Sequence, residues 1–261
     1  MEIQQFNKIE VLKLKINKGG LSSVLKLAEN LLEKSEKFYV CALNAFVTVK
    51  ANEDKELLKI INNAKIVIPD GMSSVWYSRI LNNEDHLLKR IDGFKFFYEF
   101  SKIADKKGYS YFFLGGKDDF ILKIIKKRLN KEFKNIKLKG YFSPPFMKEF
   151  KGEINDIMIN KVNECNTDIL WVGLSAPKQE KWIYRNFDKL DIKMAAGIGA
   201  VFNFYAGVVK RAPEWMQKNG LEWLYRIYAE PKRLFMKYMV YNTKFMILVV
   251  KDLFKKFFTK I

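Results

Sequence analysis

One short stretch, residues 168–182, constrains the fold more than any other part of this chain. Residues 169–172 form an apolar run typical of a buried strand, residues 173–177 a turn rich in small residues, and a helix is expected to begin at Lys178. In an open α/β sheet, ligands bind where the strands end, and backbone N–H groups at a helix N-terminus favour an anion. The stretch therefore predicts either a ligand-binding turn with Lys178 and Gln179 at its mouth or an ordinary strand-to-helix connection.

The same strand, turn and helix pattern repeats along most of the chain. We expect strands at 38–43, 64–68, 109–114, 136–141, 169–172 and 192–196, and helices at 21–34, 54–63, 94–106, 120–133 and 153–163. Residues 9–16 alternate apolar and polar, which predicts an edge strand or a hairpin, and Ser22 or Ser23 is expected to cap the first helix. Such alternation is typical of an α/β fold with a mostly parallel, doubly wound sheet flanked by helices.

The charge of the chain predicts an anionic partner. The formal net charge is +18, and residues 210–261 contain twelve Lys and Arg against four Asp and Glu. Nucleic acid, an acidic membrane surface and a phosphorylated substrate all fit such an excess. The apolar runs are too short to span a bilayer, and neither a signal peptide nor a disulfide framework is expected.

The C-terminal segment predicts helices at 215–228 and 231–260, with aromatic and basic residues interleaved. In the second helix, Phe, Met, Val and Leu recur at roughly helical spacing with lysines between them. A basic helix with an apolar face can lie in the headgroup region of an anionic bilayer, or it can dock on its own domain and expose its lysines. The local charge favours the membrane.

Several strand ends carry residues suited to chemistry. Asp70 stands in a Pro-Asp-Gly turn, where a carboxylate can act as a general base or simply belong to a turn. Asn44 can bind a sugar or close a turn. Gly115 and Gly116 open a phosphate-sized turn, although the dinucleotide-binding fingerprint and the phosphate-loop motif are both missing.

A metal site is not expected. His86 is the only histidine and lies in a polar loop, and Cys41 and Cys165 lack ligand spacing. Asp118 and Asp119 are adjacent at a predicted helix start, so they do not form an Asp-x-Asp site for Mg²⁺. We predict no metal and no cofactor.

An ordered series of motifs resembles the WecG/TagA/CpsF family of bacterial glycosyltransferases. The series comprises residues 66–71, 113–116, 172–182, 197–213 and 220–233. The resemblance implies a Rossmann-like core that binds a UDP-sugar. It also implies an inverting, metal-independent hexosyltransferase, similar to UDP-N-acetylmannosaminyltransferases, that acts on undecaprenyl-diphosphate-linked N-acetylglucosamine in teichoic-acid-like cell-wall synthesis.

The resemblance also implies roles for particular residues. Asp70 matches the catalytic base, and the predicted substrate-binding residues are Asn44, Arg90, Gly115, Gly116, Gly173, Gln179, Arg226 and Arg233. Departures from the family pattern include Ala42 in place of a common Thr, Phe94 in place of a common Asp, and Met236 or Lys237 in place of a third arginine. These changes surround the substrates, so the sugar and the acceptor stay open.

These inferences define a two-part organisation. We expect a catalytic domain at 1–208 and a basic amphipathic helical appendage at 209–261 that associates with the membrane. The expected location is the cytoplasm, peripheral on the inner face of the bacterial cell membrane, with homo-oligomerisation left open and no nucleic acid as partner. The alternatives are a basic nucleic-acid-binding α/β protein and another nucleotide-using enzyme such as a dehydrogenase.

Overall fold

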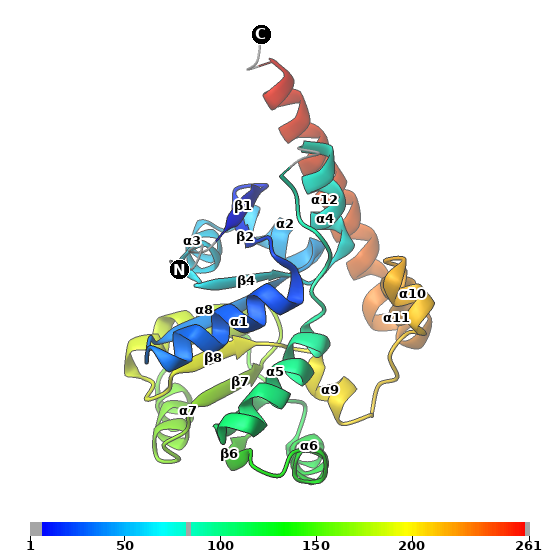
Figure 1. The fold of residues 1–261 in the computed structure, drawn as a ribbon. Coiled ribbons are helices and arrows are strands. Elements are labelled where there is room, and N and C mark those ends of the chain that lie inside the picture. The colour runs from blue at the N-terminus through cyan, green and yellow to red at the C-terminus, as the bar shows by residue number, and fades with distance from the viewer. Residues whose placement is uncertain (1–6, 82–84, 259–261) are drawn as a thin grey trace.

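The computed structural model describes residues 7–81 and 85–258 and contains a parallel sheet of six strands in the order β4-β3-β8-β7-β5-β6 (Figure 1). All six predicted strands form, and the predicted hairpin is a separate antiparallel pair, β1 and β2. The bounds are β1 (Lys8–Val11), β2 (Leu14–Asn17), β3 (Phe38–Leu43), β4 (Ile66–Pro69), β5 (Ser110–Gly115), β6 (Lys137–Phe142), β7 (Ile169–Gly173) and β8 (Met194–Gly197).

Helices cover both faces of the sheet, as expected for alternating strands and helices. One face packs against α2 (Ala45–Glu53), α3 (Lys55–Asn63), α7 (Glu153–Asn163) and α8 (Lys178–Asn186). The other face packs against α1 (Gly20–Glu33), α5 (Gly93–Lys107), α6 (Asp119–Glu132) and α9 (Val201–Tyr205). These two apolar layers confirm the predicted α/β class.

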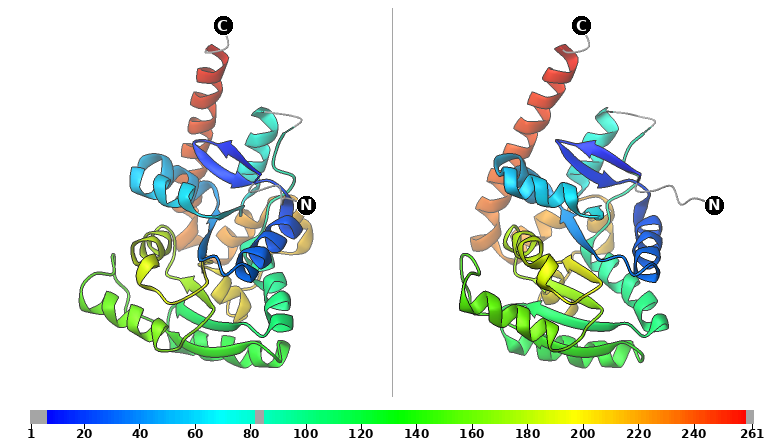
Figure 2. Two further views of the ribbon diagram at one scale, coloured as in Figure 1. Left: turned by 60° about the vertical axis from the view of Figure 1, so that its left-hand side comes forward. Right: turned by 90° about the vertical axis from the view of Figure 1, so that its left-hand side faces the viewer.

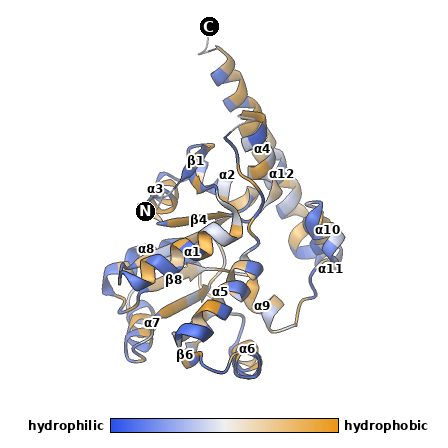
Figure 3. Ribbon diagram, viewed as in Figure 1, coloured by the Kyte–Doolittle hydropathy of each residue, from blue (hydrophilic) through white to orange (hydrophobic). Residues whose placement is uncertain are grey.

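The C-terminal region forms three helices, α10 (Glu214–Lys218), α11 (Glu222–Ala229) and α12 (Pro231–Phe258). We expected a single helix over 215–228, but the chain breaks at Gly220, whose φ is +72°. Phe245 and Val249 of α12 are buried in the core layer that contains α2. The last turns of α12 extend beyond the body of the molecule (Figure 2), and polar and apolar residues alternate along them (Figure 3).

Three helices and one cap differ from the expectation. Helices α2 and α4 (Met72–Leu81) were not predicted, since β-branched and small residues leave both without a clear apolar stripe. Helix α9, which has only five residues, was not predicted either. The expected cap at Ser22 or Ser23 is wrong. Helix α1 begins at Gly20 after the N-cap Gly19, so both serines lie within its first turn.

The strands β5 and β7 meet so closely that their last residues must be glycine. A Cβ added to Gly115 would lie 2.6 Å from the carbonyl carbon of Gly173, and its φ is +109°. We expect Gly115→Ala to lower the free energy of unfolding by more than about 2 kcal/mol, because backbone atoms cannot move aside as a side chain can. Denaturant titration measures this loss.

A matched control separates this contact from backbone strain. Gly108, just after α5, also has a positive φ, +69°, and lies in the left-handed region, but a Cβ there would meet nothing within 4 Å. Gly108→Ala should cost only about 1 kcal/mol from the left-handed conformation. Equal losses at both positions would contradict the packing explanation for Gly115.

Candidate active site

The carboxylate of Asp70 lies where β4 ends and faces the start of α5. The backbone N–H of Asp70 donates to the carbonyl of Leu43 at the end of β3, with an N···O distance of 2.8 Å. The N–H of Gly93 donates to Asp70 Oδ1 at 2.9 Å. The side chain is therefore held by a helix N-terminus at the edge of the sheet where ligands bind in such folds.

A network of four charged side chains joins this edge to the C-terminal helices. Arg90 pairs with Glu222 of α11 at 2.9 Å and with Asp92 at 3.6 Å. Arg211 pairs with Asp92 and approaches Glu222 at 3.9 Å. Asp92 also caps α5 by accepting from the N–H groups of Phe94 and Lys95. All four side chains are at most 18% exposed, so the network fixes α11 against the core.

The surroundings of Asp70 weaken its acidity. Burial raises the pKa of Asp70 to about 7, and the negative charges of Asp92 and Glu222 reinforce the shift, while the Gly93 hydrogen bond and Arg90 oppose it. A carboxyl group with a pKa near 7 accepts a proton far more readily than an ordinary aspartate near neutral pH. A raised carboxyl pKa at the edge of the sheet where the strands end is a common property of a general base.

Cationic side chains of the C-terminal helices gather near the same edge of the sheet. The guanidinium of Arg226 lies 5.5 Å from the centroid of the Phe204 ring, and that of Arg211 lies 5.9 Å from the same ring. Burial lowers the pKa of Lys237, and the like charges of Arg226 and Arg233 lower it further. Arg226, Arg233 and Lys237 therefore form one cationic cluster, although the helix is interrupted between α11 and α12.

Tyr238 of α12 lies near both the acidic groups and the cationic cluster. Burial raises the pKa of Tyr238; Arg226 opposes this rise, and the charges of Asp70 and Glu222 add to it. The Tyr238 phenol thus lies within electrostatic range of Asp70 and of Arg226. The buried Nε of Arg226 has no hydrogen-bond partner among the residues that the structure describes.

The predicted amide residues have structural roles in the geometry observed. Asn44 lies beside the turn at Gly71, and its Oδ1 accepts from the N–H of Val47 at 3.1 Å to cap α2. Gln179 is only 4% exposed, and its Nε2 donates to Glu180 Oε1 at 2.9 Å. The Gln179 amide lies against Gly197, where an added Cβ would be 3.0 Å from Nε2. Their contacts with substrate stay predictions.

The predicted glycine turns are explained by packing. Gly116 donates its N–H to the carbonyl of Gly173 at 3.1 Å, so that group already has a partner. A Cβ on Gly173 would lie 2.7 Å from the ring of Phe202. Phosphate binding at Gly115, Gly116 and Gly173 therefore stays a prediction that this geometry does not require.

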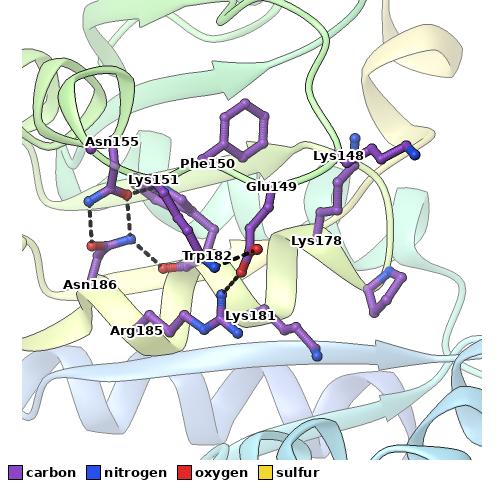
Figure 4. Close-up of a pocket in the computed structure, with 12 residues that line it drawn as sticks. Lys148, Glu149, Phe150, Lys151, Asn155, Lys178, Lys181, Trp182, Arg185 and Asn186 are labelled. Atoms are coloured by element: carbon purple, nitrogen blue, oxygen red, sulfur yellow. Dashed lines mark hydrogen bonds and ion pairs between the residues drawn. The ribbon is translucent and has the colours of Figure 1, made fainter.

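A separate hollow lies beside α8 and does not include Asp70 (Figure 4). It has a volume of about 660 Å³. Asn155 and Asn186 exchange hydrogen bonds there, and Trp182 Nε1 donates to Asn155 Oδ1 at 2.8 Å. Glu149 pairs with Lys151 and Arg185. These groups form hydrogen bonds and ion pairs with one another, so they do not indicate a ligand.

Some site residues escaped the sequence analysis. Asp92 and Tyr238 were given no role, and Arg211 and Glu222 were only parts of motifs. The signal for Asp92 was its place just before a predicted helix, where an aspartate commonly caps. The signal for Glu222 was its place in the motif at 220–233, which gave it no role. Tyr238 carried no signal, because its neighbours in the fold lie far away in the sequence.

Two further findings concern the described residues, 7–81 and 85–258. They contain no group of three His, Cys, Asp or Glu side chains that could hold a metal ion. Within the same ranges, no helix combines the length and the apolar character needed to cross a membrane.

Comparison with known proteins gives one consistent result. A profile described as "Glycosyl transferase WecG/TagA/CpsF family" matches residues 9–258. The N-acetylglucosaminyldiphosphoundecaprenol N-acetyl-beta-D-mannosaminyltransferase of Bacillus subtilis (strain 168) is 29% identical over 239 residues, covering 91% of this chain and 88% of the relative. A protein of the same name from Bacillus spizizenii strain W23 is 28% identical over 212 residues, covering 81% and 79%. These matches confirm the predicted resemblance and the predicted enzyme class, a hexosyltransferase.

Proposed function

Because this chain belongs to the WecG/TagA/CpsF family of glycosyl transferases, we propose that it transfers N-acetylmannosamine, or a related hexose, from a UDP-sugar to a lipid-diphosphate-linked N-acetylglucosamine. The names of its relatives in two Bacillus species support this donor and acceptor. The observation that carries the proposal is that Asp70, with its raised pKa, and Arg226 both lie within electrostatic range of Tyr238, at the edge of the sheet where the strands end.

The proposed reaction is a single displacement with inversion. Asp70 takes the proton of the acceptor hydroxyl while that oxygen forms a bond to the anomeric carbon of the donor sugar. The bond between the anomeric carbon and the phosphate oxygen breaks, and UDP leaves with the electron pair. Arg226, Arg233 and Lys237 stabilise the negative charge on the departing diphosphate, which is the task that fixed cations perform in such transfers.

The proposal extends to the membrane. The acceptor is anchored in a bilayer by its lipid, and α12 combines lysines with exposed Phe254, Phe257 and Phe258. A basic helix with aromatic residues binds the headgroup region of anionic bilayers. We therefore propose that α12 holds the enzyme peripherally on the inner face of the cell membrane.

A panel of UDP-sugars incubated with a short-chain lipid-diphosphate N-acetylglucosamine acceptor tests the transfer. We expect one N-acetylhexosamine donor, with N-acetylmannosamine first, to give a disaccharide-lipid of inverted configuration, and EDTA to leave the rate unchanged. Absence of product with every donor would contradict the proposed reaction. Loss of the rate in EDTA would contradict its metal independence.

The dependence of kcat/KM on pH follows from the pKa of Asp70. Asp70 accepts a proton only when it is ionised, so its activity falls as the pH drops through about 7. We expect a tenfold loss of kcat/KM per pH unit below that point. An acid limb near pH 4, the range of an ordinary aspartate, would contradict the assignment.

A further inference from the structure

Helix α4 of the core carries an apolar surface that the proposed function leaves without a role. Trp76 is 49% exposed and Ile80 is 64% exposed. They are four residues apart, so they lie on one face of the helix. Leu88, also exposed, is held next to α4 because Arg79 donates to its carbonyl at 3.0 Å. We call Trp76, Ile80 and Leu88 the α4 patch.

The α4 patch lies at the same end of the molecule as the last turns of α12. Tyr77 of α4 is buried and hydrogen-bonds to Asp252 of α12. The ammonium of Lys256 lies 5.9 Å from the centroid of the Tyr77 ring. Figures 1 and 2 show both helices pointing away from the part of the molecule formed by β6, α6 and α7. The two helices are therefore packed together at this end, and each carries exposed apolar residues.

The charges around this end match an anionic surface. Lys251, Lys255 and Lys256 lie on the last turns of α12, and Arg79 and Lys89 flank the α4 patch. A ring of cations around exposed aromatic and aliphatic residues is the composition of a surface that enters the headgroup region of an acidic bilayer. Tryptophan is enriched at that depth.

We propose that the α4 patch is a second membrane-binding element, so that the protein contacts an anionic bilayer through α4 and α12 together. This inference rests on the membrane docking of α12 proposed above. Helix α4 starts two residues after Asp70. Two membrane contacts therefore fix the height and the tilt of Asp70 relative to the lipid headgroups. A single contact through α12 would let the rest of the protein rotate about that helix.

Vesicle binding tests the inference. We compare Trp76→Ser/Ile80→Ser with Phe254→Ser/Phe257→Ser, using phosphatidylcholine vesicles with and without phosphatidylglycerol and measuring the fraction sedimented. Each double variant should lower the partition coefficient on anionic vesicles about tenfold or more, because each removes two large side chains from the interface. Phe120→Ser/Phe146→Ser is the matched control, and it should bind as the unmodified protein does. Both residues are exposed; Phe120 belongs to α6 and Phe146 follows β6, two elements far from α4 in Figure 1.

The outcomes separate the two proposals. Normal binding by the α4 variant, with weakened binding by the α12 variant, would overturn the second contact and leave the docking of α12 intact. A variant that changes from dimer to monomer in solution without losing vesicle binding would show that a second copy covers the α4 patch, which also overturns the inference. Trp76 lies close to Gly220, so Ile80→Ser alone serves if the double variant unfolds. Transfer to a short-chain acceptor measures the catalytic proposal independently.

Discussion

Replacing Asp70 by Asn should lower kcat by about 10³-fold and leave the fold intact. The amide has nearly the same shape and can still accept the N–H of Gly93, which now lies 2.9 Å from Oδ1. It cannot take a proton from the acceptor hydroxyl, and general bases contribute about 10² to 10⁴ in rate. Steady-state transfer to a short-chain acceptor measures the loss. A rate within a few-fold of the unmodified enzyme would exclude Asp70 as the base.

Asp70→Asn should lower the activity but raise the stability of the protein at pH 8. A measurement of stability therefore shows whether a loss of activity is caused by misfolding. The pKa of Asp70 is raised from 3.8 to about 7 in the folded protein, so folding favours its neutral form. The contribution of Asp70 to the free energy of unfolding is fully present below about pH 4, and it is lost as the pH rises from about 4 to about 7. Asp70→Asn should therefore raise the free energy of unfolding at pH 8 by as much as about 4 kcal/mol, and this gain should vanish near pH 4. A less stable variant at pH 8 would contradict the burial described here.

Replacing Arg226 by Ala should lower kcat by about 10²- to 10³-fold, the second-largest effect. Its guanidinium is partly buried beside Phe204, and its Nε has no partner among the described residues. The departing UDP gains negative charge as the bond breaks. Removing one preorganised hydrogen-bond donor that stabilises such a charge typically lowers kcat by about 10²- to 10³-fold. The loss should fall mainly on kcat, since the charge develops during bond breaking. Rate measurements at saturating UDP-sugar test this directly.

Two variants calibrate the effect of Arg226. Arg233 is 61% exposed and already pairs with Glu230 at 2.6 Å, so Arg233→Ala should cost only about tenfold. Lys218 on α10 is 72% exposed and pairs with Glu214, and Lys218→Ala should leave the rate unchanged. If all three variants lost activity equally, a general effect of positive charge would explain the result better than leaving-group stabilisation by Arg226.

The sheet could be predicted from the sequence because its strands are apolar runs bounded by turns. Residues 38–43 are a strand in both the prediction and the structure. Helices α2 and α4 could not be predicted, since each is short and lacks a regular apolar stripe. The pattern at 215–228 predicts one helix, but the left-handed Gly220 divides it into two. Periodicity thus identifies elements with one regular apolar face and misses short helices without such a face.

The active site was predictable only in part. The Pro-Asp-Gly turn and the family motifs indicated Asp70, and the position of Asp70 at the strand end agrees with that prediction. The carboxylates that raise its pKa come from residues 92 and 222, which are brought together by tertiary packing. Gln179 was expected at the mouth of a turn but lies buried beneath Gly197, because the glycine leaves room for its amide. Local patterns carry no information on such contacts.

The most direct test is the titration of the Asp70 carboxyl itself. Carbon-13 NMR of the full chain with labelled aspartate, with Asp70→Asn to identify the signal, measures its pKa. The account predicts a midpoint near 7, which coincides with the acid limb of kcat/KM. A midpoint near 4, the ordinary value for aspartate, would show that the carboxylate faces water and would contradict a base held between the core and the C-terminal helices.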